Sequence, residues 1–512
     1  MIALKALMPD VDNLPELQVE SLAIDSRDAK QGSLFIALKG SAADGHDYID
    51  AAIANGAVAV LSQRKVESCA VPLVVLDDLP SRVSHISGEF FGHPSKHFQC
   101  VAVTGTNGKT SVAHFVAALA AEFGISSGFL GTTGWGRLQR GQELLPATLT
   151  TADAISLQAR MAQLKAEGCE LVALELSSHA LQQHRGDALD IDIALFTNLT
   201  RDHLDYHGTM QAYGAAKARL FEFESLRGIA INADDSFGQE LATQHTVSLE
   251  GNNTEPVKLV LLGSVEAPQS EAATINVSRL KSTPHGLSWK LVSPWGDAEV
   301  SSPVIGSYNS TNLSLAIAAL ALLGYDFQRV IQAVPAVSAP PGRLERVNEF
   351  SAKDEFSAKD GSVSVFVDYA HTPDALESML VAVRAHCEGR LICVFGCGGD
   401  RDKGKRGPMG RAVQRFADVG VLTSDNPRFE EPVSIIKEVE AGLESPHQIQ
   451  IEPDRAKAIS LAIGQAKTND VVIIAGKGHE DYQEVRGERL PFSDVEVARK
   501  RLAMQISGEG QH

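Results

Sequence analysis

Short apolar runs rich in β-branched residues recur along the chain, and longer segments with helical spacing separate them. Alternation of buried-type strands with helices is typical of an α/β protein with parallel sheets. The apolar runs predict strands at Ser33–Leu38, Ala57–Leu61, Leu73–Leu76, Leu171–Leu176, Ile191–Thr197, Gly228–Asn232, Val363–Asp368, Leu391–Gly396, Val419–Thr423 and Val471–Ala475.

The same pattern divides the chain into three parts. At roughly 150 residues per domain, 512 residues suggest about three domains. Residues 1–99 give mixed secondary-structure signals with a few short strands, whereas predicted strands and helices alternate over residues 100–339. The sequence Ala339-Pro340-Pro341-Gly342 is a natural break. The four strands and intervening helices of residues 340–512 predict a second, doubly wound sheet.

Composition and charge narrow the class of protein. The net charge of −18 argues against a nucleic-acid or membrane-surface binder, but not against anionic substrates held by local basic groups. The N-terminus lacks a secretory apolar region, and the apolar stretch near Leu313–Leu323 is too short to span a bilayer. The six cysteines form no CxxC pair, which favours free thiols in a reducing compartment. We therefore expect a cytoplasmic protein without membrane insertion.

The segment VAVTGTNGKTS at Val101–Ser111 carries the most specific chemistry. An apolar run ends in a glycine-rich turn, and a helical pattern over Ser111–Phe123 follows. Strand, glycine-rich turn, Lys-Thr and helix together form a nucleotide-phosphate cradle, in which Lys109 reaches the β/γ-phosphates and Thr110 ligates Mg²⁺. The loop is a shortened variant, because Val103 stands where the usual first glycine would be. The alternative, a tight turn with a surface lysine, does not account for Lys-Thr in this context.

Polar, charged and glycine residues follow six of the predicted strands. Ligands of open α/β sheets gather at the carboxyl ends of the strands, so these tails predict a large active site. The tails read ELSSH at Glu175–His179, TNLTRDHLD at Thr197–Asp205, DYAH at Asp368–His371, GCGGDRDK at Gly396–Lys403, SDNPR at Ser424–Arg428 and GKGHE at Gly476–Glu480.

These motifs, in this order, resemble the Mur ligases, ATP-dependent enzymes that build the peptide stem of the bacterial cell wall. The matching segments are TGTNGKT, ELSSHAL, NLTRDHLDYHG, YGAAKARLF, GSYNSTN, PGRLE, DYAHTP, GCGGDRDKGKRG, DNPR and AGKGHE. The resemblance implies an N-terminal uridine-nucleotide-binding α/β domain (1–99), a central P-loop ATPase-like parallel-sheet domain (100–339) and a C-terminal Rossmann-like amino-acid-binding domain (340–512).

The resemblance also implies an activity. A carboxylate is a poor electrophile, and phosphorylation by ATP to an acyl phosphate supplies a leaving group that an amine displaces. The N-terminal motifs DSR, GSLFIALKG and DGH resemble the branch of the family that ligates meso-2,6-diaminopimelate to UDP-N-acetylmuramoyl-L-alanyl-D-glutamate in cytoplasmic peptidoglycan precursor synthesis. We expect a monomer that uses ATP and Mg²⁺ and binds small-molecule substrates. Two alternatives are a folylpoly-γ-glutamate synthase-like ligase and a catalytically inactive nucleotide-binding regulator.

Candidate catalytic and nucleotide-binding residues follow from the motifs. The oxygen ligands of Thr110 and Glu175 suit Mg²⁺, and by resemblance His203 is a metal ligand and Lys217 is carbamylated. From residue type alone, Glu175 and His203 could equally be capping or buried residues, and Lys217 a solvated helix lysine. The expected catalytic residues are Lys109, Glu175, His203 and Lys217, and the expected ATP contacts are Gly105, Thr106, Asn107, Gly108, Lys109, Thr110, Ser111, Asn309, Asn312, Arg343, Asp368 and His371.

Candidate substrate residues fall into two sets. By resemblance, the UDP-muramoyl-dipeptide contacts are Ile24, Ser26, Ser41, Ala42, Ala43, Thr150, Thr151, Ser177, Gln183 and Arg185. The diaminopimelate contacts are Arg401, Asp425, Asn426, Pro427, Arg428, Gly476 and Glu480. A planar guanidinium at Arg428 can hold the carboxylate that distinguishes diaminopimelate from lysine. The alternative for DNPR is an Asx-type turn with a solvated arginine. The tandem FSAKDE and FSAKDG at Phe350–Gly361 receives no function.

Overall fold

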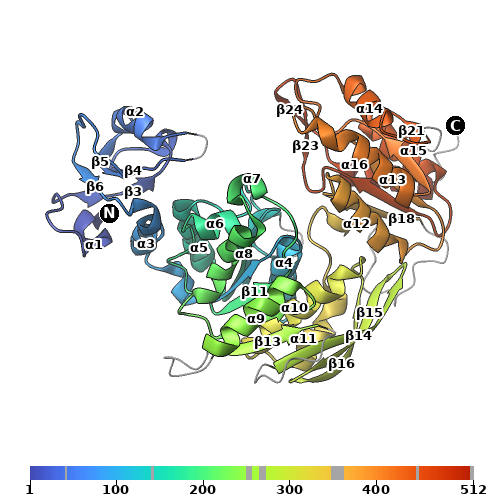
Figure 1. Ribbon diagram of the computed structural model, residues 1–512, viewed down its shortest axis with the longest axis horizontal. Helices are drawn as coiled ribbons and strands as arrows, with labels where there is room; N and C mark the ends of the chain where they lie inside the picture. The colour runs from blue at the N-terminus through green and yellow to red at the C-terminus, as the bar shows by residue number, and fades with distance from the viewer. Residues whose placement is uncertain are drawn as a thin grey trace. The chain divides into compact units, whose positions relative to one another are not determined.

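The computed structural model describes residues 1–40, 43–139, 143–248, 257–263, 273–347, 363–445 and 449–507 (Figure 1). Contacts divide the chain into two compact units. Unit 1 comprises Met1–Thr274 with Leu315–Asp326, and unit 2 comprises Ile275–Ser314 with Phe327–His512. The FSAKDE/FSAKDG repeat lies outside the described residues. The division into domains 1–99, 100–339 and 340–512 stays a prediction.

The N-terminal part of unit 1 is a small sheet whose faces are both covered. All strands are parallel, in the order β3-β4-β5-β6. Alternate strand residues face opposite sides, so Leu34 and Ile36 pack with α1 and α3, whereas Phe35 and Ala37 pack with α2. The elements are β1 (Ile2–Ala3), α1 (Leu4–Leu7), β2 (Gln18–Val19), β3 (Ser21–Ala23), β4 (Ser33–Ala37), α2 (Ile49–Ala54), β5 (Ala57–Ser62), β6 (Leu73–Val75) and α3 (Leu79–Phe91).

The larger part of unit 1 is a mainly parallel sheet built around β7. Its strands run in the order β13-β12-β11-β7-β10-β8-β9, with only β9 antiparallel. Helix α4 packs on β7, β8 and β10. The elements are β7 (Gln99–Thr104), α4 (Lys109–Glu122), β8 (Ser127–Gly131), β9 (Gly134–Arg137), α5 (Ala154–Ala166), β10 (Leu171–Glu175), α6 (Ser178–Gln182), β11 (Ile193–Phe196), α7 (Leu204–His207), α8 (Met210–Ala218), β12 (Gly228–Asn232), α9 (Ser236–Ser248) and β13 (Lys258–Leu262).

Unit 2 begins with an antiparallel arrangement that the apolar runs did not predict. Strands β14, β15 and β16 pair in sequence order. Burial alternates along β15, as at Trp289 and Lys290, so this strand contains no continuous apolar run. The elements are β14 (Ala273–Thr283), β15 (Gly286–Ser293), β16 (Gly296–Ser302), α10 (Tyr308–Leu322), which runs on into unit 1, and α11 (Phe327–Ala333).

The C-terminal part of unit 2 is the doubly wound sheet that the sequence predicts. Strand order is β17-β18-β22-β19-β20-β21, and only β17 is antiparallel. On β19, Cys393 and Phe395 pack with residues of α12, α13 and α14, whereas Ile392 and Val394 pack with residues of α15 and α16. The elements are β17 (Arg343–Arg346), β18 (Ser364–Asp368), α12 (Pro373–Arg384), β19 (Leu391–Phe395), α13 (Arg406–Phe416), β20 (Val419–Leu422), α14 (Pro432–Glu440), β21 (Ile449–Ile451), α15 (Arg455–Gln465), β22 (Val471–Ala475), β23 (Tyr482–Val485), β24 (Glu488–Pro491) and α16 (Asp494–Ser507).

In the part of the chain that the structure describes, no helix has the length and apolar character needed to cross a membrane. All six cysteines are free thiols, and Cys100, Cys169, Cys393 and Cys397 are buried.

Candidate active site

The glycine-rich loop joins β7 to α4 and leaves no room for side chains at its first position. Gly105 has φ +149°, and a Cβ atom there would lie 1.8 Å from Thr197 Oγ1. Gly108 has φ +86° and immediately precedes Lys109, the first residue of α4. The loop therefore brings backbone N–H groups and the N-terminus of a 14-residue helix to one place, which is a favourable site for an anion.

The loop is held by the segment that follows β11. Thr106 N donates to Asn198 O (2.7 Å), and Asn107 N donates to Asn198 Oδ1 (3.0 Å). Thr197 Oγ1 donates to Asn107 O (2.6 Å), and Thr200 N donates to Thr106 Oγ1 (3.0 Å). These bonds fix the loop before any ligand binds, which lowers the cost of ordering it later.

Two lysines converge on the same carbonyl of this loop. Lys109 Nζ donates to Gly105 O (3.0 Å) and Thr106 O (2.8 Å), and Lys217 Nζ donates to Gly105 O (2.6 Å). Lys217 is 1% exposed, with Nζ 4.2 Å from the centre of the Tyr213 ring. Burial, and next the charge of Lys109, lower the pKa of Lys217 to about 6. Its amine is therefore largely neutral at pH 7, unlike a solvated helix lysine.

Glu175 ends β10 at the same edge of the sheet. It pairs in register with Val103 of β7 and is 1% exposed. Its Oε1 accepts from Thr132 N (2.7 Å), and Oε2 accepts from Thr132 Oγ1 (3.3 Å). Thr110, in the first turn of α4, is also buried. The described residues contain no group of three or more His, Cys, Asp or Glu side chains that could hold a metal.

Imidazole rings gather beside this edge. The ring of His203 lies 4.9 Å from that of His179 and 6.0 Å from that of Tyr213. His203 is a non-glycine residue at φ +52° and precedes α7. Burial, and next the charges of His203 and His207, lower the pKa of His179 to about 4, so this ring is neutral at pH 7.

The residues expected to contact the muramoyl-dipeptide form a connected polar group. Thr132 Oγ1 lies 3.1 Å from Thr150 Oγ1, and Thr151 Oγ1 donates to the Glu175 carbonyl (2.7 Å). Arg185 Nη1 donates to Thr151 O (2.8 Å), and its Nε donates to Gln183 Oε1 (3.0 Å). Ser177 caps α6 by accepting from Ala180 N (3.2 Å). The connection to Glu175 places this group beside the phosphate loop.

The expected uridine contacts lie in the N-terminal sheet. Ser26 is buried in the turn that follows β3, and its carbonyl accepts from Asn55 Nδ2 (2.8 Å). Ile24 is half-buried, and Ala43 is exposed. Ser41 and Ala42 lie outside the described residues.

The expected adenine- and ribose-side residues lie in unit 2. Asn312 Nδ2 donates to Asn309 Oδ1 (2.9 Å), and both side chains are buried at the start of α10. Arg343 stacks on the Tyr369 ring, with Cζ 4.9 Å from its centre. Asp368 ends β18, and burial raises the pKa of its carboxyl. Burial lowers the pKa of His371, three residues further on.

The expected diaminopimelate residues meet at the carboxyl edge of the C-terminal sheet. Asn426 Nδ2 donates to Glu480 Oε2 (2.8 Å), and Arg428 Nη1 donates to Gly399 O (2.8 Å). Gly476 has φ +115°, and a Cβ there would lie 2.5 Å from Asp425 Oδ2. Tails that follow β19, β20 and β22 thus form one polar cluster. Pro427 lies within it, whereas Arg401 is exposed on the loop after β19.

Sequence reasoning missed three residues of these sites. Asn198 holds the phosphate loop, and Lys477 is fully buried with Nζ 3.1 Å from Glu480 Oε2 and 3.0 Å from Asn426 Oδ1. Glu484 forms an ion pair with Arg428 (3.3 Å). The motifs NLTRDHLDYHG and AGKGHE contain the first two, but their residue types gave no signal of burial or bonding. Glu484 lies beyond every motif.

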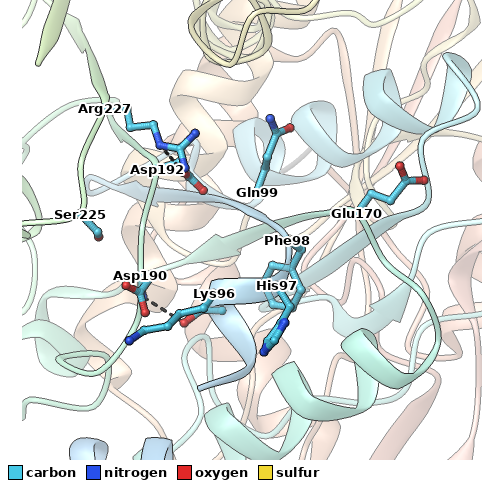
Figure 2. Close-up of a pocket in the computed structure, with 10 residues that line it drawn as sticks. Lys96, His97, Phe98, Gln99, Glu170, Asp190, Asp192, Ser225 and Arg227 are labelled. Carbon is cyan, nitrogen blue, oxygen red and sulfur yellow. Dashed lines mark hydrogen bonds and ion pairs between the residues drawn. The ribbon is translucent and has the colours of Figure 1, made fainter. Parts of the chain in front are cut away.

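A separate cavity lies at the opposite edge of the unit 1 sheet (Figure 2). It has a volume of about 480 Å³, and its lining includes Gln99, Glu170, Asp192 and Arg227, which stand at the amino ends of β7, β10, β11 and β12. Arg227 Nε pairs with Asp192 Oδ1 (3.0 Å). Because none of the expected catalytic residues lines it, this cavity is not the candidate active site.

The family comparisons match three segments of the chain. Residues 18–83 match "Mur ligase family, catalytic domain", residues 103–320 match "Mur ligase middle domain", and residues 343–478 match "Mur ligase, glutamate ligase domain".

Individual relatives match over nearly the whole chain. UDP-N-acetylmuramoyl-L-alanyl-D-glutamate–2,6-diaminopimelate ligase of Ectopseudomonas mendocina is 41% identical over 493 residues, covering 95% of both chains. The protein of the same name from Pseudomonas aeruginosa is 40% identical over 509 residues, covering 98% of both. A solved structure of a ligase of that name has a TM-score of 0.71 at 34% identity and covers 99% of both chains.

Proposed function

The chain belongs to the Mur ligase family, and on that premise we propose that it joins meso-2,6-diaminopimelate to UDP-N-acetylmuramoyl-L-alanyl-D-glutamate at the expense of ATP. The observation that carries the proposal is the 41% identity, over 95% of both chains, to a ligase named for these two substrates. The enzyme is an ATP-dependent amide-forming ligase.

The reaction needs an activated carboxylate and a positioned amine. ATP phosphorylates a carboxylate of the dipeptide's glutamate to an acyl phosphate and leaves as ADP. The amine of diaminopimelate then attacks the acyl carbon, loses a proton and displaces phosphate. We assign Lys109, together with the N–H groups of residues 105–111, to the β/γ-phosphates. The ammonium group and the N–H dipoles, held in fixed positions, neutralise negative charge that develops during phosphoryl transfer.

We assign Mg²⁺ to Thr110, Glu175 and His203. These residues fit Mg²⁺ because the Glu175 carboxylate and the Thr110 hydroxyl are buried at the same edge of the sheet. Mg²⁺ commonly takes one or two carboxylates together with phosphate oxygens and water, so a larger acidic cluster is not required. When bound, Mg²⁺ supplies charge neutralisation at the phosphates.

We further propose that CO₂ carbamylates Lys217. The reaction forms an N–C bond between the neutral amine and CO₂ and releases one amine proton, so a neutral amine becomes an anion. The buried position of Lys217 and its bond to the carbonyl of Gly105 support a role for this anion beside the phosphate loop.

The remaining residues are assigned to substrates. Ile24, Ser26 and residues 41–43 are assigned to the uridine nucleotide, and Thr150, Thr151, Ser177, Gln183 and Arg185 to the muramoyl-dipeptide. In the C-terminal pocket, Arg428 is assigned to the distal carboxylate of diaminopimelate, and Asp425, Asn426 and Glu480 to its ammonium. Asn309, Asn312, Arg343, Asp368 and His371 are assigned to the adenosine side of ATP. We place the enzyme in the cytoplasm as a monomer of three domains.

The test is phosphate release from ATP by the purified chain with UDP-MurNAc-dipeptide and each candidate amino acid. Release that requires both the dipeptide and meso-diaminopimelate supports the proposal. Release with a folate and glutamate instead would identify a folylpoly-γ-glutamate synthase-like ligase. Nucleotide binding without release under any combination would identify an inactive regulator.

A further inference from the structure

The hairpin β23–β24 lies directly after the predicted AGKGHE motif and packs on the turn Asp425–Arg428. Its two-residue turn, Arg486-Gly487, has positive φ at both positions (51° and 82°), the geometry of a type I′ turn that sets strand register. The register is therefore fixed locally, and with it the residues that face the Asp425–Arg428 turn.

Glu484 is the hairpin residue with the most bonds to this turn. Its backbone N–H donates to Asn426 Oδ1 (2.9 Å), and its carbonyl accepts from Arg428 N (3.0 Å). Its carboxylate Oε2 lies 3.3 Å from Arg428 Nε. Gln483 adds a bond from its Nε2 to Asp425 O (2.6 Å). One strand of the hairpin thus contacts Asp425, Asn426 and Arg428, three of the four residues of the turn.

Arg428 is held in an unfavourable backbone conformation by the same hairpin. Its φ is +53°, in the left-handed region that non-glycine residues seldom adopt. Besides the bond from its N–H to Glu484 O, its carbonyl accepts from Arg486 N (2.6 Å). Such strain persists only where surrounding bonds fix the residue, and it concentrates at functional sites.

The guanidinium is fixed on two of its three nitrogens. Nε faces Glu484, and Nη1 donates to Gly399 O (2.8 Å). Among the residues that the structure describes, Nη2 has no hydrogen-bond partner. Both side chains of the pair are only about one-fifth exposed, so the pair is largely shielded from solvent and can fix the orientation of the guanidinium.

We propose that Glu484 is a positioning residue for amino-acid selection. On the basis of the proposed function, Glu484 orients the guanidinium of Arg428 so that its Nη edge meets the second carboxylate of the amino-acid substrate. Glu484 touches no reacting atom and acts only through Arg428.

The experiment is a double-mutant cycle on the full chain. Glu484→Ala should raise KM for meso-diaminopimelate about ten-fold or more, the usual effect of losing a bond to a charged group. The kcat at saturating diaminopimelate and the KM values for ATP and UDP-MurNAc-dipeptide should stay as in the wild type. Glu484→Gln retains an acceptor oxygen, so its KM for meso-diaminopimelate should lie between those of the wild type and Glu484→Ala. Glu488→Gln, at an exposed position on the other strand of the hairpin, is the matched control and should behave as wild type.

In the Arg428→Ala background, Glu484→Ala should have no further effect on this KM, because its effect passes through the guanidinium. An unchanged or lowered KM in Glu484→Ala, or effects that multiply in the double variant, would overturn the proposal. If Glu484→Ala does not fold, Glu484→Gln takes its place in the same double-mutant cycle with Arg428→Ala. Failure of the wild type to use meso-diaminopimelate would instead refute the proposed function.

Discussion

Single residues near the phosphate loop owe their chemistry to burial rather than to residue type. Lys217 and Lys109 both reach Gly105 O, yet only Lys217 is fully enclosed. Enclosure disfavours the ammonium, so the amine is the form that persists at neutral pH. The two lysines are therefore suited to different tasks: Lys109 to a phosphate contact and Lys217 to covalent modification.

We predict that activity falls as pH is lowered through about 6, the pKa of Lys217. Because burial depresses this pKa, the amine is neutral above about 6 and protonated below it, and only the neutral amine attacks CO₂. ¹³C NMR with labelled bicarbonate should show a carbamate signal in the wild type that disappears at lower pH and is absent in Lys217→Ala. Short carboxylic acids should partly restore activity to Lys217→Ala. An unmodified, ordered ammonium in the active enzyme would contradict this prediction.

We predict that Lys109→Met lowers kcat by about 10²-fold or more, because a fixed cation facing the phosphoryl group is lost. The fold should survive, since Lys109 Nζ donates to two carbonyls of its own loop rather than holding distant elements together through these bonds. The measurement is steady-state phosphate release, with circular dichroism as the check on folding. Wild-type turnover by the folded variant would remove Lys109 from the mechanism.

At the level of elements, the β7–α4 loop depends on glycine for two reasons. Its positive φ disfavours side chains, and the segment after β11 occupies the space that a side chain would need. The strain and the clash can be separated experimentally, because Gly168 has positive φ (+77°) and nothing within 4 Å of its Cβ position.

We predict that Gly105→Ala destabilises the protein by about 3 kcal/mol or more, the combined effect of strain and overpacking. Gly168→Ala, the control, should cost only about 1–2 kcal/mol. Only Gly105→Ala should also abolish nucleotide binding. Thermal unfolding and ATP titration of both variants provide the check, and equal effects on binding would disprove the role of the loop.

The sequence predicted elements best where strands are buried on both faces. Gly228–Asn232 and Val471–Ala475 have the bounds that their apolar runs indicate. The helix after the phosphate loop begins at Lys109 rather than Ser111, because Lys109 and Thr110 already belong to its first turn, directly after the left-handed Gly108. Strand β15 was not predicted, since its buried and half-exposed residues alternate.

At the scale of the whole molecule, the predicted site residues separate by unit. The phosphate loop and the dipeptide residues lie in unit 1, and the adenosine-side and diaminopimelate residues lie in unit 2. Motifs identified many of these residues because they lie in polar tails that follow strands. They did not identify Lys477 or Glu484, because burial of Lys477 and pairing of Glu484 depend on packing between segments distant in sequence.

We propose that the enzyme selects meso-diaminopimelate through Arg428. With lysine bound, the guanidinium would be desolvated without its anion, and a site built for a polar group discriminates by about 10⁴-fold or more. The most direct measurement is kcat/KM for meso-diaminopimelate and L-lysine in the wild type and in Arg428→Ala. We predict strong preference for diaminopimelate in the wild type and its loss in the variant. Equal use of lysine by the wild type, or unchanged use of diaminopimelate by the variant, would contradict selection through Arg428.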